Sequence, residues 1–403
     1  LPDTIERNVL VWQSNHTQQW TKDFKSMVEE DSTGKLNFLL INVEALATDK
    51  GAKHLQEFLA THDCMLAIDE STTIKNPKAK RTKNLVKLAP MAKYRRILTG
   101  FPITKAPLDL YSQCYFLHPE LLGYNSYYAF RARYAITQRR QMGGQAFDHI
   151  VGYQRLDELQ ESIKYFSTRY KKEDCLDLPE KLYIKRYVEL TTEQKKAYEQ
   201  MKKEAIMVLE EETFTTVNVL TQLMRLQQVV AGSLRGPDGK IIKLKNNRLQ
   251  SVLDVIEETQ GKVVIFGVFH TDIETLAEAL QSKYGKNSTA TYYGNTPQSE
   301  RQNIITRFQD PDSELKYFIS NPMTGGRGIT LTEANVIIYY SNSYDLELRI
   351  QSEDRIHRIG QDNKCTYVDL VSPDTVDEHI LKTLLNKVKI SNEILGEVRQ
   401  WFD

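Results

Sequence analysis

Residues 64–69 read Cys-Met-Leu-Ala-Ile-Asp, a run that is apolar at consecutive positions and ends in a carboxylate. Residues 37–42, Asn-Phe-Leu-Leu-Ile-Asn, have the same character. A strand with apolar residues on both faces is typical of a parallel sheet that helices cover on both sides. The two runs therefore predict an α/β fold built on buried parallel strands.

Short apolar runs alternate with amphipathic stretches outward from these two. In the first part the pattern predicts strands at Asn8–Trp12, Leu36–Asn42, Cys64–Asp69 and Arg95–Gly100, and helices at Gln18–Glu29, Gly51–His62 and Ala79–Leu88. In the second half it predicts strands at Lys262–Phe269, Thr289–Gly294, Leu315–Asn321, Asn335–Ser341 and Thr366–Ser372, and helices at Asp272–Lys283, Pro297–Phe308, Leu346–Arg358 and Val376–Lys389. Because 403 residues exceed what one core usually supports, we predict two α/β lobes.

We predict that the chain divides into three consecutive segments. Residues 1–177 form a first lobe with a helical insertion at about 105–177, residues 178–245 form linking helices, and residues 246–403 form a second lobe. The insertion is rich in aromatic residues, which we expect mostly to form its own core, and Arg139 and Arg140 beside a Gly143-Gly144 turn are its candidates for partner contact. The linking helices begin at Thr191-Thr-Glu-Gln194, which has capping-box spacing.

Charge is balanced overall, with 53 Lys plus Arg against 53 Asp plus Glu, so net charge indicates no partner. No acidic residue occurs from Ser71 to Leu108, whereas basic residues are frequent there. This basic block consists of Lys75, Lys78, Lys80, Arg81, Lys83, Lys87, Lys93, Arg95, Arg96 and Lys105. A block of one sign predicts a phosphate-binding surface, although it can also be a merely solvated face.

The cysteines exclude some classes of protein. The four, Cys64, Cys114, Cys175 and Cys365, are far apart and form no Cys-x-x-Cys motif, which argues against a zinc site and fits a reducing compartment. The sequence contains no apolar run of membrane-spanning length and no signal-like opening. We therefore expect a cytoplasmic protein, in a bacterial or phage-infected cell.

Two groups of residues carry candidate chemistry. Asp69 and Glu70 close a predicted buried strand, where one carboxylate could hold a Mg²⁺-bound water and the other orient an attacking water. The alternative is that residues 69–72, Asp-Glu-Ser-Thr, cap the next helix. Gly325-Gly-Arg-Gly328 follows a predicted strand, so its backbone N–H groups could approach a phosphate.

Residues 351–361, Gln-Ser-Glu-Asp-Arg-Ile-His-Arg-Ile-Gly-Gln, are predicted to be helical up to Gly360. On that reading Arg355 and Arg358, three positions apart, share one face and suit a polyphosphate. The alternative is a surface helix in which Glu353 and Asp354 neutralise these arginines.

Several motifs together resemble a known family. They are residues 262–266 (Lys-Val-Val-Ile-Phe), 293–302 (Tyr-Gly-Asn-Thr-Pro-Gln-Ser-Glu-Arg-Gln), 321–332 (Asn-Pro-Met-Thr-Gly-Gly-Arg-Gly-Ile-Thr-Leu-Thr), 351–361, 69–77 (Asp-Glu-Ser-Thr-Thr-Ile-Lys-Asn-Pro), 94–103 (Tyr-Arg-Arg-Ile-Leu-Thr-Gly-Phe-Pro-Ile) and 108–119 (Leu-Asp-Leu-Tyr-Ser-Gln-Cys-Tyr-Phe-Leu-His-Pro). Their order and spacing resemble Swi/Snf-type DNA-translocating ATPases of superfamily two, of a phage or prophage kind. The resemblance covers nearly the whole chain and implies two RecA-like lobes, ATP and Mg²⁺ as cofactors, and double-stranded DNA as a partner contacted mainly through phosphates.

The resemblance also implies roles for single residues. Asp69 would hold the Mg²⁺ shell, Glu70 would activate the lytic water, and Arg355 and Arg358 would reach the phosphates of ATP. The other implied contacts are to nucleotide by Gln351, Gly326 and Gly328, between the lobes by Thr99 and Gly100, and to DNA by Lys75, Arg96, Lys105 and Thr330.

Two departures from the family pattern matter. Asp-Glu-Ser-Thr replaces Asp-Glu-Ala-His, so Thr72 cannot act as an imidazole would. There is no Gly-x-x-x-x-Gly-Lys-Ser/Thr motif, and residues 32–35, Ser-Thr-Gly-Lys, are interpreted as a turn. We expect the phosphate loop to lie before Leu1, which makes the first lobe incomplete and the chain alone inactive. The favoured function is an ATP-driven translocase on double-stranded DNA; the alternatives are a non-enzymatic DNA-binding or regulatory module and a strand-separating helicase.

Overall fold

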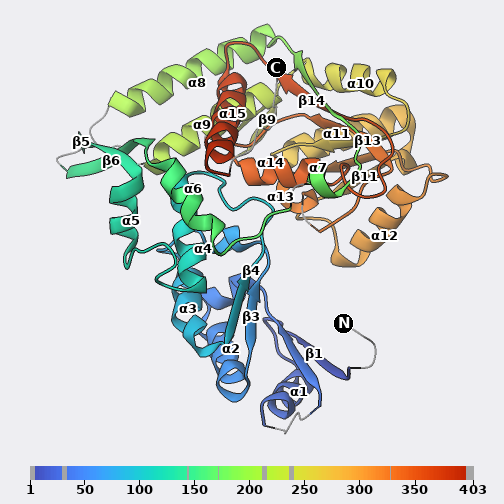
Figure 1. Ribbon diagram of the computed structural model, residues 1–403. Helices are drawn as coiled ribbons and strands as arrows, with labels where there is room; N and C mark the ends of the chain where they lie inside the picture. Colours follow the sequence, from blue (N-terminus) through green and yellow to red (C-terminus); the bar gives the residue numbers. More distant parts are fainter. Residues whose placement is uncertain are drawn as a thin grey trace. The chain divides into compact units, whose positions relative to one another are not determined.

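The computed structural model describes residues 5–29, 34–142, 145–170, 172–210, 216–235, 240–326 and 328–395 (Figure 1). The chain divides into two compact units. The first unit comprises residues 1–138, 150–167 and 393–396, and the second comprises 139–149, 168–392 and 397–403. Both units combine strands with helices, so the predicted α/β class is confirmed.

The second unit is organised around a six-stranded sheet with the order β11-β12-β10-β13-β14-β7. All neighbouring strands are parallel. The strands are β7 (Lys181–Tyr187), β10 (Lys262–Phe266), β11 (Thr289–Tyr292), β12 (Tyr317–Ser320), β13 (Ala334–Tyr339) and β14 (Cys365–Val371). The helices are α10 (Arg248–Glu258), α11 (His270–Tyr284), α12 (Gln298–Gln309), α13 (Pro322–Gly325), α14 (Leu346–Glu353) and α15 (Val376–Leu395).

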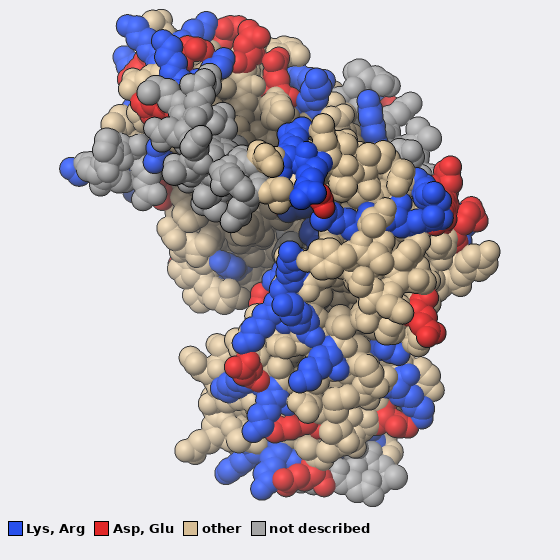
Figure 2. All heavy atoms as spheres, turned by 90° about the vertical axis from the view of Figure 1, so that its left-hand side faces the viewer, with Lys and Arg blue, Asp and Glu red and all other residues tan. Residues whose placement is uncertain are grey.

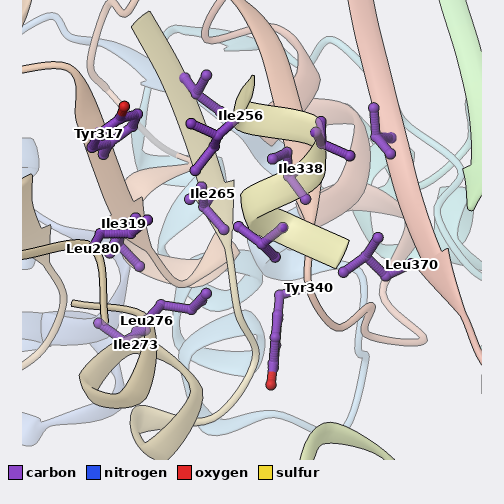
Figure 3. Close-up of a cluster of buried hydrophobic side chains, with 14 of the residues drawn as sticks. Ile256, Ile265, Ile273, Leu276, Leu280, Tyr317, Ile319, Ile338, Tyr340 and Leu370 are labelled. Atoms are coloured by element: carbon purple, nitrogen blue, oxygen red, sulfur yellow. The ribbon is translucent and has the colours of Figure 1, made fainter. Parts of the chain in front are cut away.

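Alternate residues of β10 enter two different cores. Val263 and Ile265 belong to a cluster that includes residues of α10 and α11, part of which is shown in Figure 3. Val264 and Phe266 belong to a second cluster that includes Phe308 of α12. Every residue of β10 is buried. The apolar character of these strands is thus explained by cover on both faces, as predicted for a buried parallel sheet.

Strand β7 was not anticipated, because residues 178–245 were predicted to form linking helices. It pairs in parallel with β14, from Lys181 opposite Cys365 to Tyr187 opposite Val371. As the last strand of the sheet it has one neighbour, and its burial alternates along most of its length. The prediction that residues 178–245 link two lobes stays a prediction. The seven residues of β7, however, belong to the six-stranded sheet of the second unit.

The segment after β7 contains the two expected helices. They are α8 (Thr192–Glu210) and α9 (Thr216–Ala231). The capping box is confirmed, because Gln194 N–H donates to Thr191 Oγ1 over 3.2 Å and Thr191 N–H donates to Gln194 Oε1 over 3.1 Å. β8 (Ser233–Arg235) and β9 (Ile241–Lys243) then pair in antiparallel fashion, as a hairpin-like segment requires. Residues 236–239 lie outside the described residues.

The first unit contains two parallel strand pairs. β1 (Arg7–Val11) pairs with β2 (Leu36–Leu40), and β3 (Met65–Ile68) pairs with β4 (Tyr94–Ile97). Helices α1 (Gln18–Glu29), α2 (Asp49–Thr61) and α3 (Lys80–Leu88) contribute to a common core with residues of β1 and β3. The short 3₁₀ helices of the chain are η1 (Val43–Ala47), η2 (Ser71–Ile74), η3 (Ala89–Met91), η4 (Pro107–Asp109) and η5 (Lys286–Ser288).

Burial on both faces was the wrong expectation for the strands of the first unit. Large apolar side chains of all four strands are exposed, among them Val9 and Val11 at 53% each, Leu40 at 51%, Met65 at 64% and Tyr94 at 57%. Within the described residues, core side chains thus cover one side of each strand pair. An apolar run does not predict which faces of a strand are buried, because the side chains that pack on those faces come from residues distant in sequence.

The predicted helical insertion is partly β-structured. It contains α4 (Leu110–Leu117), α5 (Tyr127–Tyr134), α6 (Leu156–Lys164) and α7 (Lys172–Cys175), but also β5 (Ala135–Met142) and β6 (Gln145–Tyr153), which pair with each other. The Gly143-Gly144 pair lies outside the described residues. The expectation that most of the aromatic residues form its core is met only in part: Tyr111, Phe130 and Tyr134 are buried, whereas Tyr128, at 64%, and Tyr165, at 90%, are exposed. Arg139 and Arg140 are exposed.

No helix among the described residues has the length and apolarity needed to cross a membrane. All four cysteines are free thiols, and Cys175 alone is exposed.

Candidate functional site

Asp69 and Glu70 lie where β3 ends, as predicted, and both are exposed. Leu98 N–H donates to Ile68 O over 2.8 Å and Ser71 N–H donates to Leu98 O over 3.0 Å, so the residue that follows β4 fixes this turn. Glu70 has φ 49° and ψ 58°, a left-handed conformation. A non-glycine residue in this region costs on the order of 1–2 kcal/mol, and such residues are concentrated at functional sites.

The alternative that residues 69–72 cap a helix is wrong. Glu70 occupies the position before η2, and no side chain there accepts a capping hydrogen bond. Ser71 instead donates from Oγ to Gln113 Oε1 over 2.6 Å, and Thr72 is buried. Asp69 Oδ1 accepts the N–H of Glu70 over 2.9 Å. The carboxylates therefore stand at a strained turn without a capping role.

Gln113 was missed by the sequence analysis. Its Nε2 donates to Pro102 O over 2.9 Å and to Asp109 O over 2.8 Å, while its Oε1 accepts from Ser71. It thereby joins α4 and the loop after β4 to the turn at Asp69 and Glu70, which we call the carboxylate turn. A glutamine inside the largely apolar helix Leu110–Leu117 was the available signal, and in the structure this side chain is 1% exposed.

The loop after β4 carries Thr99, Gly100 and Lys105. Thr99 Oγ1 accepts the N–H of Phe101 over 3.1 Å. Gly100 is exposed, and a Cβ built there meets nothing within 4 Å, so packing in the first unit does not demand glycine. Asp109 Oδ2 accepts the N–H groups of Thr104 and Lys105 over 3.0 and 2.7 Å, which orders the loop.

The residues of the basic block have different environments. Lys75 is half-buried and its Nζ donates to Thr104 Oγ1 over 2.6 Å, so this lysine also organises the loop after β4. Arg96 and Lys105 are exposed. Lys93 pairs with Asp63 over 2.5 Å, so the block is not uniformly positive once folded. Figure 2 shows clusters of Lys and Arg in the first unit, with Asp and Glu beside several of them.

In the second unit, the predicted helix through Arg358 is wrong, because α14 ends at Glu353. The N–H of Asp354 donates to Ile350 O over 3.0 Å, but the carbonyl of Arg355 accepts the N–H of Leu331 over 2.9 Å. Gly360 then has φ 94°, which a helix does not allow. We call Asp354–Gln361 the arginine loop.

The arginine loop nevertheless brings the two guanidiniums together. Arg355 donates from NH1 to Ile329 O over 3.0 Å and from Nε to Gln351 O over 2.8 Å. Arg358 donates from NH1 to the same Ile329 oxygen over 3.4 Å. Both arginines are half-buried. Arg355, Arg358 and Gln351 are thus neighbours, and Ile329 places them beside Thr330, which is also half-buried.

Glu353 and Asp354 have cationic partners other than these arginines. Glu353 accepts from Arg349 Nε over 2.9 Å and from Lys181 Nζ over 3.1 Å. Asp354 pairs with Lys172 over 2.5 Å. These contacts argue against the alternative of a locally neutralised surface helix.

Packing restricts Gly326 in the segment of residues 325–328, which we call the glycine turn. A Cβ on Gly326 would lie 2.2 Å from Pro322 O, and the N–H of Gly326 already donates to that oxygen over 3.0 Å. A phosphate contact by this N–H would require the turn to open. Gly328 has φ 68° and open space around it, so it is the freer candidate. Arg327 lies outside the described residues.

A buried ionic network below the arginine loop was also missed. Arg349, at 3% exposure, contacts Asp369 twice, from NH1 over 2.5 Å and from NH2 over 3.0 Å. Its guanidinium lies 3.6 Å from the centre of the Tyr339 ring. The available signal was a carboxylate inside the apolar strand run Val368-Asp369-Leu370.

Two compact α/β units with a carboxylate turn in one and paired arginines in the other define a helicase-like protein of superfamily two. The SNF2-related domain matches residues 4–233, and the helicase conserved C-terminal domain matches residues 244–360. Because the first match covers more than half of the 403 residues, the chain belongs to the SNF2-related family.

Relatives in other organisms agree with this assignment. A Bacillus subtilis protein, YwqA, whose name gives it as an ATP-dependent helicase/translocase, is 24% identical over 366 residues, covering 88% of this chain and 38% of its own length. The mouse SWI/SNF-related matrix-associated actin-dependent regulator of chromatin subfamily A member 1 is 27% identical over 362 residues, 86% of this chain and 33% of its own. The solved C-terminal part of the Fun30 ATPase domain aligns with TM-score 0.43 and 18% identity, covering 55% of this chain and 98% of that one. The chain spans about a third of the length of the curated relatives it matches.

Proposed function

We propose that the protein is an ATP-dependent translocase on double-stranded DNA. The observation that carries this proposal is the convergence of Arg355 and Arg358 on one carbonyl oxygen in a chain of the SNF2-related family. Two permanently charged guanidiniums held this close favour a ligand with several negative charges, such as the phosphates of ATP. Their role is to meet the charge that develops during phosphoryl transfer.

The carboxylate turn supplies the second half of the chemistry. A Mg²⁺ ion bound with ATP needs one or two carboxylates and otherwise keeps waters or phosphate oxygens as ligands. Asp69 fits this requirement, because it is an exposed carboxylate at the end of a strand. Among the described residues no group of three His, Cys, Asp or Glu could hold a metal by itself, which is consistent with a site completed by nucleotide. Glu70 would orient the attacking water.

The phosphate loop is the part of the proposed site that this sequence does not supply. The sequence has no Gly-x-x-x-x-Gly-Lys-Ser/Thr motif, so we assign none of the 403 residues to that role. Gln351 and Gly328 would contribute the remaining nucleotide contacts. Hydrolysis by these 403 residues alone is not expected.

The DNA backbone phosphates would be contacted by Arg96, Lys105, Lys75 and Thr330. Such contacts position a protein without reading sequence. Arg96 and Lys105 are exposed, as phosphate contacts require. Lys75 would act both on DNA and through its hydrogen bond to Thr104.

A non-enzymatic DNA-binding module is the second candidate, and the absence of the phosphate-loop motif is what favours it. The left-handed Glu70 argues for the enzyme, because a binding module has no evident use for a strained carboxylate. The test is ATP hydrolysis by a form of the protein that also supplies a phosphate loop. Hydrolysis stimulated more by duplex than by single-stranded DNA supports the proposal, and no hydrolysis with intact DNA binding supports the module.

A further inference from the structure

The arginine loop and the residue before it, Glu353, are held by a segment 170 to 185 positions earlier in the chain. We call this segment, Lys172–Tyr183, the strap. Lys172 Nζ lies 2.5 Å from the Asp354 carboxylate and 3.4 Å from the carbonyl oxygen of His357. The Nε2 of His357 lies 2.8 Å from the carbonyl oxygen of Pro179. A carbonyl can only accept, so this nitrogen carries the proton.

The strap also reaches the last residue of α14. Glu353, at 1% exposure, accepts from both Lys181 Nζ over 3.1 Å and Tyr183 OH over 2.8 Å at Oε2. Its other oxygen accepts from Arg349 over 2.9 Å. A carboxylate this deeply buried needs all of these partners, because an unpaired buried charge is strongly destabilising.

The charges of this network balance only when the strap is included. Arg349 contacts two buried carboxylates, Glu353 and Asp369, at 1% and 0% exposure. One guanidinium against two carboxylates leaves one negative charge in the interior. Lys181, whose side chain is 26% exposed, brings the second positive charge to Glu353. The strap therefore supplies the balancing cation for the end of α14, where the arginine loop begins.

The opposite side of the loop is fixed by the segment before β13. Arg355 O accepts the N–H of Leu331 over 2.9 Å. Gln361 Nε2 donates to Thr332 O and Ala334 O over 3.0 and 2.9 Å. The loop is thus clamped between two stretches of the second unit, and the strap is the stretch nearer to a unit boundary. The chain crosses from the first unit to the second between Ser167 and Thr168, shortly before Lys172.

We propose that the strap is a positioning element that fixes the arginine loop, and with it Arg355 and Arg358, through Lys181, Tyr183 and the carbonyl of Pro179. The role of the two arginines rests on the proposed function, but the clamp itself does not.

Hydrogen exchange of the 403-residue chain, without nucleotide or DNA, tests this proposal. Lys181→Met keeps the aliphatic stem and removes the cation, so the amides of Leu331 and of the arginine loop should exchange at least about tenfold faster. Tyr183→Phe removes one hydrogen bond and should accelerate the same amides by about threefold or more. Lys364→Met is the matched control, since it breaks an exposed pair between Lys364 and Glu180 of the strap and should change exchange by less than about twofold.

A rescue separates positioning from general stability. In Lys181→Met with Glu353→Gln the uncompensated charge is gone, so exchange in the loop should return to within about threefold of the unaltered protein. Unchanged loop exchange in Lys181→Met would overturn the proposal. Equal acceleration of the amides of β10 and β12 would also overturn it, because the network would then serve the whole sheet. None of these results depends on ATP hydrolysis, so they stand whether or not the proposed function does.

Discussion

Arg355 and Arg358 donate to the same backbone oxygen, that of Ile329, over 3.0 and 3.4 Å. Their proximity does not depend on a helix, because α14 has already ended at Glu353. Two permanently charged guanidiniums held on one neutral oxygen favour an anion with several oxygens, and we propose that the phosphates of ATP are this ligand.

Arg355→Ala or Arg358→Ala should abolish DNA-stimulated ATP hydrolysis in a form of the protein that supplies a phosphate loop. The expected loss in kcat is about 10³-fold or more, because a guanidinium that meets transition-state charge is worth that much in phosphoryl transfer. DNA affinity should stay within about twofold, since we propose that these side chains contact nucleotide rather than DNA. Arg186→Ala, which removes an exposed ion pair with Glu258, is the matched control and should retain activity. Equal losses of hydrolysis and DNA binding would reassign the loop to DNA.

The 403-residue chain alone should bind ATP weakly, with a Kd above about 100 µM. The backbone N–H groups and lysine of a phosphate loop are absent from the sequence, so the β and γ phosphates lack their main donors. Isothermal titration calorimetry with Mg²⁺ and ATP measures this directly. A Kd in the low micromolar range would show that the residues present form a complete nucleotide site.

DNA affinity should fall steeply with salt and show little preference for sequence, because phosphate contacts release counterions and read no bases. Arg96→Glu should reduce the slope of log Kd against log salt by about 1. Lys75→Glu should flatten it as well, with some disorder of the loop after β4, because Thr104 loses its donor. Lys53→Glu on α2 is the control, as that lysine is already paired with Glu57. If Arg96→Glu and Lys53→Glu give the same slope, the DNA contacts lie elsewhere.

Stability of the second unit should depend on pH through Asp272. This carboxyl accepts from Ser341 Oγ over 2.7 Å, and burial raises its pKa to about 7. In the unfolded chain the pKa is about 3.9, so between about pH 4 and pH 7 the folded state keeps a proton that the unfolded state loses. The contribution is complete below that window and lost as pH rises through it, by at most about 1.4 kcal/mol per pH unit.

Asp272→Asn cannot ionise and should flatten this part of the pH dependence. Urea denaturation at several pH values across the window measures the slope. Asp312→Asn, at an exposed turn, is the control and should leave the slope unchanged. Identical slopes in all three proteins would mean that Asp272 keeps an ordinary pKa when folded.

The sequence located elements well where burial follows local spacing. Helix α1 occupies Gln18–Glu29 as predicted, because Trp20, Phe24 and Met27 place one buried side chain on each turn. Strand β7 was missed although Lys181–Tyr187 partly alternates in burial, because its pairing with β14 is a contact between distant residues. The exposed faces of the strand pairs in the first unit were also not predicted, because burial of a strand face depends on contacts between distant residues.

For the candidate site, the sequence predicted where Asp69 and Glu70 lie along the chain better than it predicted the backbone conformation. Asp69 and Glu70 stand at the end of β3 as expected, but the left-handed backbone of Glu70 has no local sequence signal. The helical reading of Arg355 and Arg358 failed because Leu331 captures the Arg355 carbonyl from outside the segment. In both cases hydrogen bonds between separate segments decide the conformation.

We propose that the protein moves along duplex DNA without separating its strands. Strand separation needs a wedge and aromatic side chains that stack on exposed bases, whereas the stretch from Ser71 to Leu108 contains two aromatic residues, Tyr94 and Phe101, and Tyr111, Phe130 and Tyr134 of the insertion are buried. The most direct test is displacement of a labelled third strand from a DNA triplex, beside unwinding of a forked duplex, by a form of the protein that supplies a phosphate loop. A duplex translocase should displace the third strand in an ATP-dependent way and leave the fork closed, whereas efficient opening of the fork would make the protein a strand-separating helicase.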